Sequence, residues 1–269
     1  MRFSDPATAR IYSDRDVDPS WVDWCREALD PRGKVIVDIG CGGGIYSRAF
    51  LKCGAKTVYG IDSSAQYVDE AKVSSPDVIF KVAQCHNTGL ESGLADIVFE
   101  RALIHHLHGF ELTENAREMR RLLGSNGVAL VQDRTQEDVI AFDDRFWMRR
   151  ELMRMFPRLV DYEASRRPKA VEYLHILQEA GFDRVEVEVH AETRKVYRTR
   201  EELAEELMAR KGKSILFELS DRELGKYIDR ITSIAPSSEI VECDQWTLWK
   251  AIQQGAPGAH LTAVQSAGG

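Results

Sequence analysis

The stretch VIVDIGCGGG at residues 35–44 constrains the fold of this chain more than any other feature. The aliphatic run Val35–Ile39 contains one acid, Asp38, and four glycines follow within five positions. A short apolar run is expected of a strand that is covered on both faces of a parallel sheet. A glycine loop at the carboxyl end of such a strand commonly holds a nucleotide. We therefore expect an α/β fold with a nucleotide site at this loop.

Strands and helices are expected to alternate through the first half of the chain. The predicted strands are 35–39, 57–62, 78–83, 95–100 and 128–133, and the predicted helices are 45–53, 65–73 and 114–123. A turn is expected at Gly124–Gly127, between the last of these helices and the last strand. Regular alternation of this kind indicates βαβ units and a parallel sheet.

The second half has longer helical stretches. A helix is expected at 142–160, broken near Pro157, followed by a helix at 170–180 and a strand at 184–190. Two helices with capping boxes come next, and a final strand is expected at 239–251. The prediction is one domain over 1–254, with an N-terminal lid at about 1–30 and cap insertions at about 134–169 and 191–238. Residues 255–269 are rich in Gly, Ala and Ser and are expected to form a disordered tail.

Composition narrows the class of protein. The chain has 269 residues, 43% hydrophobic, which is enough for one large domain. The net charge of −7 disfavours a generic nucleic-acid binder. The five cysteines are scattered without a CxxC pair, as expected of reduced thiols in a cytosol. No apolar run approaches the length of a membrane span, and the N-terminus lacks the apolar core of a signal peptide, so a cytoplasmic location is predicted.

The glycine loop does not match the common nucleotide motifs. The dinucleotide fingerprint G-x-G-x-x-G/A, begun at Gly40, puts Ile45 where a small residue is needed, which disfavours a nicotinamide-dependent oxidoreductase. A P-loop is excluded because no Gly-Lys-Ser/Thr follows. Asp38 would repel a pyrophosphate and attract a cationic amine, and Asp62 lies where an acid binds the ribose hydroxyls of a nucleoside. A nucleoside with an amino acid tail fits these residues best.

At this point the sequence resembles the class I S-adenosylmethionine-dependent methyltransferases. The resemblance depends on four blocks in order: VIVDIGCGGG, GID at 60–62, ADIVFERALIHHL at 95–107 and EMRRLLGSNGVALVQD at 118–133. It implies a Rossmann-like seven-stranded sheet with helices on both faces and a partly helical cap. It also implies S-adenosyl-L-methionine as the methyl donor.

The resemblance implies a role for several residues. Asp38, Gly40 and Gly42 would lie near the methionyl group, Asp62 would bind the ribose, and Ser63 would lie beside the adenine. The adenine block departs from the family pattern, since Gln84 and Cys85 stand where Gly-Asp-Ala is frequent. Tyr12 would face the sulfonium from the N-terminal segment. The cofactor-binding candidates are Tyr12, Asp38, Gly40, Cys41, Gly42, Asp62, Ser63, Gln84 and Cys85.

Structural roles are alternatives for several of these candidates. The glycines could form a tight turn only, Asp62 could cap the helix that starts near Ala65, Cys41 could be a small buried filler, and Tyr12 could be an ordinary surface or core aromatic.

The catalytic candidates are Arg101, His105 and His106, just after the fourth strand. Methyl transfer depends mainly on alignment and exclusion of water, and a base helps only if the acceptor must lose a proton. The two histidines could instead pack against the sheet, and Arg101 could bind an anionic acceptor or pair with Glu100. A metal is not expected, because Glu100-Arg101 stands where metal-dependent relatives have an Asp.

The acceptor is predicted to be a small molecule methylated on O, N or S. The arginines and aromatic residues of 142–167 would form a lid over it, although an RNA-binding face and a solvated helix face are alternatives. An RNA-directed methyltransferase and a non-catalytic cofactor-binding regulator are the alternative functions. The sequence leaves the oligomeric state open.

Overall fold

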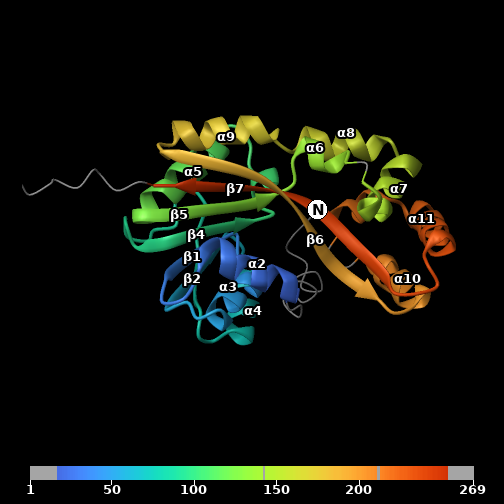
Figure 1. Ribbon diagram of the computed structural model, residues 1–269, viewed down its shortest axis with the longest axis horizontal. Coiled ribbons are helices and arrows are strands. Elements are labelled where there is room, and N and C mark those ends of the chain that lie inside the picture. The colour runs from blue at the N-terminus through green and yellow to red at the C-terminus, as the bar shows by residue number, and fades with distance from the viewer. Residues whose placement is uncertain (1–16, 142, 211–212, 254–269) are drawn as a thin grey trace, which may run out of the picture.

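The computed structural model describes residues 17–141, 143–210 and 213–253 (Figure 1). Tyr12, about half of the expected N-terminal lid and the expected tail at 255–269 lie outside the described residues. Among the helices that the structure describes, none is long and apolar enough to cross a membrane.

Seven strands form one mixed sheet in the order β3-β2-β1-β4-β5-β7-β6. The strands β1 to β5 pair in parallel, and β7 is antiparallel to both β5 and β6. Their bounds are β1 Val35–Ile39, β2 Thr57–Asp62, β3 Ile79–Val82, β4 Ala95–Arg101, β5 Leu123–Asp133, β6 Arg184–Tyr197 and β7 Ile240–Ile252. The predicted Rossmann-like fold class is confirmed.

Helices cover both faces of the sheet because successive strand residues point to opposite sides. On one face, Ile36 packs in a cluster with Trp21 and Phe50, which belong to α2 (Pro19–Leu29) and α3 (Ile45–Lys52). On the other face, Val37 packs with Met119 and Leu177. Figure 1 shows the two layers, one on each side of the sheet. The first layer is completed by α4 (Ala65–Ser74), and the second consists of α5 (Phe110–Leu122) and α9 (Ala170–Glu179).

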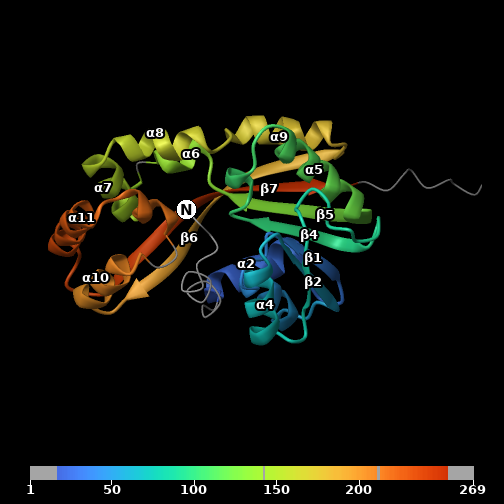
Figure 2. The same ribbon diagram turned by 180° about the vertical axis from the view of Figure 1, so that it is seen from behind.

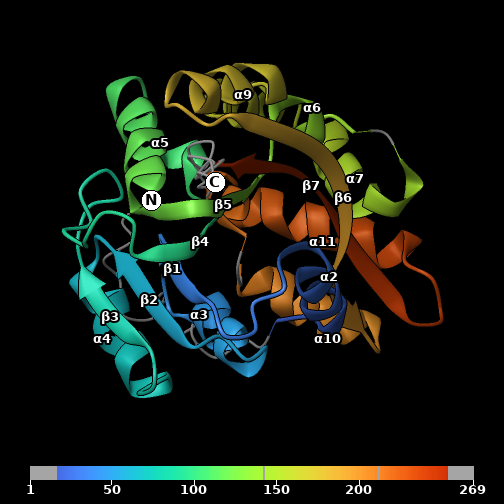
Figure 3. The ribbon, with the colours of Figure 1, turned by 60° about the vertical axis from the view of Figure 1, so that its left-hand side comes forward.

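The last two strands extend beyond the sheet. Strand β5 pairs with β7 only over Thr247–Ile252, whereas β6 and β7 stay paired as far as Tyr197 and Ile240. The extension curves away from β1–β5 and reaches α10 (Arg200–Met208) and α11 (Asp221–Ile234) (Figure 3). A register shift between Thr193 and Lys195 marks a bulge in β6.

A helical cap with its own apolar core covers this extension. It consists of α6 (Gln136–Val139), α7 (Trp147–Met155), α8 (Arg158–Ser165), α10 (Arg200–Met208) and α11 (Asp221–Ile234), with the short 3-10 segments η2 (Asp144–Phe146) and η3 (Ser214–Glu218). The cap core is a cluster of buried residues separate from the two clusters at the sheet. Seen from behind, the cap lies at the opposite end of the molecule from β4 and β5 (Figure 2).

Some predicted boundaries are wrong. Strand β6 continues to Tyr197 rather than ending at His190, so the helical part of the second insertion begins at Arg200. Residues 124–127 belong to β5 as a bulge, because Ala95 faces Leu123 whereas Ile97 faces Val128. The predicted break near Pro157 is confirmed, since α7 ends at Met155 and α8 begins at Arg158.

Candidate active site

A cavity of about 700 Å³ lies between the carboxyl ends of the parallel strands and the cap. Neighbouring strands β1 and β4 are where the strand order reverses, and ligands of open α/β sheets bind at this point. One end of the cavity is lined by the glycine loop and the residues after β2, and the other end by cap residues and the extension of β7. The cavity therefore joins the residues that were predicted to bind the cofactor to residues of the cap.

The glycine loop has the backbone conformation that a close ligand requires. Gly40 and Gly42 have φ of 70° and 51°, in the left-handed region that favours glycine. A Cβ at Gly40 would lie 3.1 Å from the side chain of Leu103, whereas one at Gly42 would meet no atom within 4 Å. The missing side chain at Gly42 thus leaves open space beside the cavity that it lines.

Asp62 ties the end of β2 to the glycine loop. Its Oδ2 accepts from the Gly42 N–H at 2.9 Å, and its Oδ1 accepts from the Ser64 N–H at 2.9 Å. Burial raises the pKa of Asp62, while these backbone donors oppose the rise. Ser64 is the N-cap of α4, with its side chain accepting from Tyr67 N–H, so the interpretation of Asp62 as that cap is wrong. Asp62 itself lines the cavity.

Asp38 lies behind the cavity wall. It is 3% exposed, is absent from the cavity lining and accepts a 2.5 Å hydrogen bond from the Ser47 hydroxyl. Burial raises the pKa of Asp38 to about 7. A carboxyl group in this state offers less than a full negative charge at neutral pH.

The structure brings most of the other predicted cofactor residues together. Gly40, Cys41, Ser63, Gln84 and Cys85 all line the cavity with Asp62. The cysteine thiols are not reactive nucleophiles here, because burial raises the pKa of both, that of Cys85 to about 12.

Arg101 lines the cavity but does not pair with Glu100, so that alternative is wrong. Its guanidinium forms two hydrogen bonds to Glu192, at 2.9 and 2.8 Å, and lies over the ring of Trp246 at 4.0 Å. Glu100 accepts instead from Asn115 at 3.0 Å. Adjacent residues of a strand point to opposite faces, so Arg101 and Glu100 cannot both face the cavity.

His105 and Asp133 form a buried pair at the cavity wall. His105 follows β4 in the short 3-10 segment η1 (Ile104–His106), and Asp133 ends β5. The His105 Nδ1 lies 2.9 Å from both oxygens of Asp133. Burial lowers the pKa of His105 although Asp133 opposes the shift, and the pKa of Asp133 is held well below its usual range. At neutral pH the pair is therefore an uncharged imidazole beside a carboxylate.

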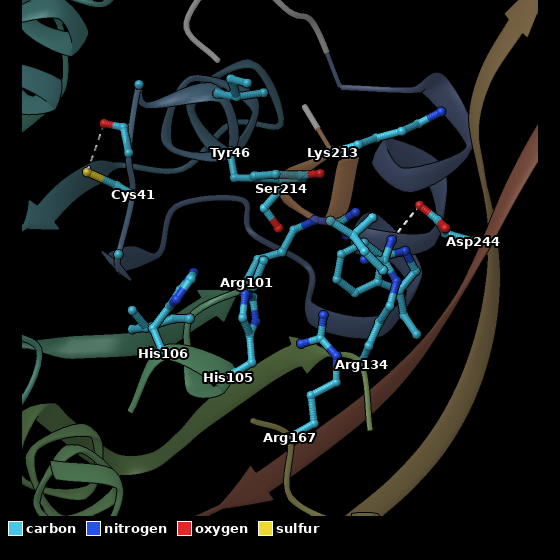
Figure 4. Close-up of a pocket in the computed structure, with 18 of the residues that line it drawn as sticks. Cys41, Tyr46, Arg101, His105, His106, Arg134, Arg167, Lys213, Ser214 and Asp244 are labelled. Atoms are coloured by element: carbon cyan, nitrogen blue, oxygen red, sulfur yellow. Dashed lines mark hydrogen bonds and ion pairs between the residues drawn. The ribbon is translucent and has the colours of Figure 1, made fainter. Parts of the chain in front are cut away.

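His106 lies beside this pair and also lines the cavity, with its ring centroid 4.0 Å from that of His105. Desolvation and the neighbouring His105 lower the pKa of His106. Figure 4 shows the two histidines with Arg101 at the cavity.

The cap end of the cavity is rich in charge that the sequence-based prediction missed. Arg134, Glu192, Arg194, Glu242 and Asp244 all line it but were not predicted. The signal was present in the last strand: buried positions alternate at Ile240, Glu242, Asp244 and Trp246, so its buried side carries two acids. Alternation of buried charges on one side of a strand indicates a polar site rather than a core.

Arg149 and Arg167, from the predicted lid segment 142–167, also line the cavity. So do Lys213 and Ser214, for which the sequence predicts no role. Phe142 lies outside the described residues. Within the described ranges, no three His, Cys, Asp or Glu side chains form a group that could hold a metal ion.

The fold and cavity define a Rossmann-like protein with a ligand site at the strand switch point. Residues 36–127 match the family model described as a methyltransferase domain. Over 80 residues the chain is 41% identical to the ubiquinone biosynthesis O-methyltransferase of Pseudomonas fluorescens (strain SBW25), a stretch that covers 30% of this chain and 28% of that relative.

Solved structures agree over most of the chain. A protein assigned to the methyltransferases of an antibiotic biosynthesis pathway in Anabaena variabilis ATCC 29413 has a TM-score of 0.67 and 23% identity, covering 88% of this chain and 98% of its own. Phosphoethanolamine N-methyltransferase 2 of Haemonchus contortus, with phosphomonomethylethanolamine and S-adenosylhomocysteine, has a TM-score of 0.58 and 18% identity, covering 93% and 57%. Residues 36–127 thus resemble a methyltransferase domain, the chain spans less than a third of the curated relative's length, and it shares the fold of these solved methyltransferases.

Proposed function

We propose that the protein transfers the methyl group of S-adenosylmethionine to a small molecule that is enclosed beneath the cap. The carrying observation is the single cavity of about 700 Å³ that the glycine loop and the cap line together. A cavity of this size is ordinary for a small-molecule site. Both the donor and the acceptor would lie in the same enclosed space, as an in-line transfer requires.

The cofactor end fits a nucleoside with an amino acid tail. Gly42 leaves open space at the loop, and Asp62 lines the cavity, where its carboxylate oxygens can accept from ribose hydroxyls as well as from backbone N–H groups. Gly40 and Gly42 would hold the methionyl part, while Ser63, Gln84 and Cys85 would lie by the adenine. The bound cofactor supplies an electrophilic methyl group, and the chain's own residues align the acceptor and exclude water.

The His105–Asp133 pair supports an acceptor that loses a proton. A neutral imidazole that donates Nδ1–H to a carboxylate keeps its Nε2 lone pair, which makes it a general base. A hydroxyl or another protonated acceptor atom would need such a base. Arg101 is held by Glu192 and Trp246, so we assign it to shaping the wall rather than to proton transfer.

The RNA-directed alternative has less support from the arginine-rich segment. Arg167 is 5% exposed and Arg149 is also turned inward to line the cavity. The outward arginines of the segment, such as Arg145 and Arg154, each pair with an acid. An internal cavity suits a small acceptor better than a phosphate backbone.

Calorimetric titration tests this function. S-adenosylhomocysteine should bind the protein and NAD should not, and Asp62→Ala should weaken the binding by about 1.5–3 kcal/mol through loss of charge-assisted hydrogen bonds. Asp69→Ala, on the exposed side of α4, is the matched control and should bind as the wild type does. Tight NAD binding without S-adenosylhomocysteine binding would overturn the proposal. Release of S-adenosylhomocysteine across a small-molecule panel then distinguishes an enzyme from a non-catalytic regulator.

A further inference from the structure

Three arginines, of which Arg167 is buried and the other two are half-buried, face one another across the cap end of the cavity. Arg134 follows β5, Arg149 lies on α7, and Arg167 follows α8. Figure 4 shows Arg134 and Arg167 directed into the same interior space. Since the three come from different segments, only the folded cap brings them together.

Two acids hold the three arginines in a row. Asp244 pairs with Arg134 and lies 3.6 Å from Arg149. Glu163 lies 3.6 Å from Arg149 and 2.7 Å from Arg167. The row thus alternates arginine and acid, and Arg149, in the middle, has the longest contacts.

The guanidinium groups nevertheless keep donors without acceptors. The buried atoms without a hydrogen bond include Arg134 Nε and Arg167 Nε and Nη1. Arg149 Nε and Nη1 also lack one, because the acids nearest to them, Asp244 and Glu163, lie 3.6 Å away. The indole nitrogen of Trp246, another lining residue, is also unpartnered, and the Trp246 ring lies under the guanidiniums of Arg101 and Arg134 at 4.0 and 4.2 Å. Buried donors in native proteins almost always have acceptors, so a concentration of open donors around one space points to a missing acceptor.

The charge of this end of the cavity has the same implication. Six cations line it; the four acids beside them and the Asp133 carboxylate, 4.0 Å from Arg167, leave a surplus of one positive charge, by six minus five. The cations are Arg101, Arg134, Arg149, Arg167, Arg194 and Lys213, and the acids are Glu163, Glu192, Glu242 and Asp244. Two further lining acids, Asp62 and Glu111, belong to the cofactor end, where Glu111 neighbours Cys85. Water could fill donor positions but would not neutralise the surplus charge.

We propose that the methyl acceptor carries an oxyanion, a carboxylate or a phosphate, which the open donors of Arg134, Arg149 and Arg167 bind. This inference rests on the proposed function, because it names the acceptor class of the same cavity. Guanidinium groups suit such ligands because their planar forks match the geometry of both oxyanions.

The place of the arginines also limits the size of the acceptor. Arg167 Nη1 lies 4.0 Å from Asp133, which holds His105. The oxyanion would therefore lie close to the group that receives the proton. The acceptor is a compact anion, with the methylated atom near His105 and the oxyanion toward α7 and α8.

Titration with three probes of similar shape tests whether the cavity binds an oxyanion. Benzoate, phenyl phosphate and the neutral benzamide are titrated into the protein, with and without saturating S-adenosylhomocysteine. At least one anion should bind ten times more tightly than benzamide, and the tighter of the two anions identifies the source as carboxylate or phosphate. If neither anion binds, or if benzamide binds as tightly, the inference is wrong.

Substitution at Arg149 shows whether binding occurs at the arginine row. Arg149→Gln should weaken anion binding at least tenfold, because it removes a charged group that donates hydrogen bonds. The affinity of Arg149→Lys for the anion should lie between those of Arg149→Gln and the wild type. Arg149→Gln should still fold, because Glu163 retains its ion pairs with Arg166 and Arg167, and Asp244 retains its ion pair with Arg134. Arg154→Gln on the same helix, whose side chain is 63% exposed, is the matched control.

Cofactor binding separates this inference from the proposed function. S-adenosylhomocysteine should bind Arg149→Gln as it binds the wild type, since Arg149 lies at the other end of the cavity. Equal anion binding by Arg149→Gln and wild type would overturn the inference alone. Failure of S-adenosylhomocysteine to bind the wild type would overturn the proposed function. The titration of the anions without S-adenosylhomocysteine would still show whether the arginines bind an anion.

Discussion

At the residue scale, the site depends on side chains whose state is set by their surroundings. His105 and His106 are neighbours in the chain, and the His105 Nδ1 lies 2.9 Å from both Asp133 oxygens. Two histidines at these positions could be recognised from the sequence as following a strand. The pairing of His105 with Asp133 could not, because it depends on β5 placing Asp133 beside its ring.

The protonation of His105 provides a prediction that needs no acceptor. Burial lowers the His105 pKa and Asp133 raises it, so removing the carboxylate charge leaves burial unopposed. The imidazole NMR signals of His105 should show a pKa below 6.5 in the wild type and a still lower one in Asp133→Asn. Once an acceptor is known, His105→Ala should slow transfer about 10²–10⁴-fold with unchanged S-adenosylhomocysteine affinity. A His105 pKa that rises in Asp133→Asn would contradict the pairing.

At the scale of elements, β7 joins the sheet to the cap. Its first half carries Glu242, which accepts from Tyr197 Oη at 2.7 Å, pairs with Lys213 at 2.7 Å and lies 3.2 Å from Arg194. The strand thereby holds the bulge of β6 and the segment before η3 against each other. Its second half is ordinary sheet, with Trp249 and Ala251 in the core.

Truncation of Glu242 should loosen the cap. Glu242→Ala removes a buried acid that Lys213 and Arg194 share, and breaking a buried pair in this way costs about 3–5 kcal/mol. Urea unfolding should show this loss, and hydrogen exchange should show increased opening in α10 and η3 before β1 or β4. Glu239→Ala, an exposed acid at the start of the same strand segment, is the control and should change little. Uniform loss of protection in the sheet would argue against a role confined to the cap.

At the scale of the whole molecule, buried carboxyl groups make stability depend on pH. Burial raises the pKa of Glu100 from 4.5 to about 8 and that of Asp38 from 3.8 to about 7. Between the unfolded and folded values, the folded protein binds more protons than the unfolded chain. With respect to these groups, the free energy of unfolding should therefore be highest below about pH 4 and fall as the pH rises toward 8.

Glu100→Gln tests this dependence. The amide cannot ionise and still offers an oxygen to Asn115. Between pH 5 and pH 8 the free energy of unfolding should therefore fall less in the variant than in the wild type, by roughly 2–4 kcal/mol. Part of the slope should remain because Asp38 is unchanged. Chemical denaturation at several pH values measures this dependence of the free energy of unfolding on pH. Parallel pH profiles for the variant and the wild type would show that Glu100 is ionised in the folded protein.

The sequence by itself determined the parallel sheet, the order of its early elements and the likeness to a methyltransferase domain. These depend on local patterns: an aliphatic run before a glycine loop, an acid after the second strand, and helices of regular spacing. Each pattern involves residues within about 30 positions of one another, where the chain's own periodicity sets the structure. The loop VIVDIGCGGG therefore predicted a nucleoside site, and its candidates Gly40, Gly42 and Asp62 do line one cavity.

Only the tertiary structure decided what faces that site from the other side. Arg134, Arg149 and Arg167 meet because β6 and β7 run beyond the sheet and carry the cap over the strand ends. Arg101 pairs with Glu192, 91 residues away, rather than with its neighbour Glu100. Such contacts depend on the register of paired strands and on the packing of distant helices, which no local pattern encodes. The donor end of the cavity was thus visible in the sequence, whereas the acceptor end required the fold.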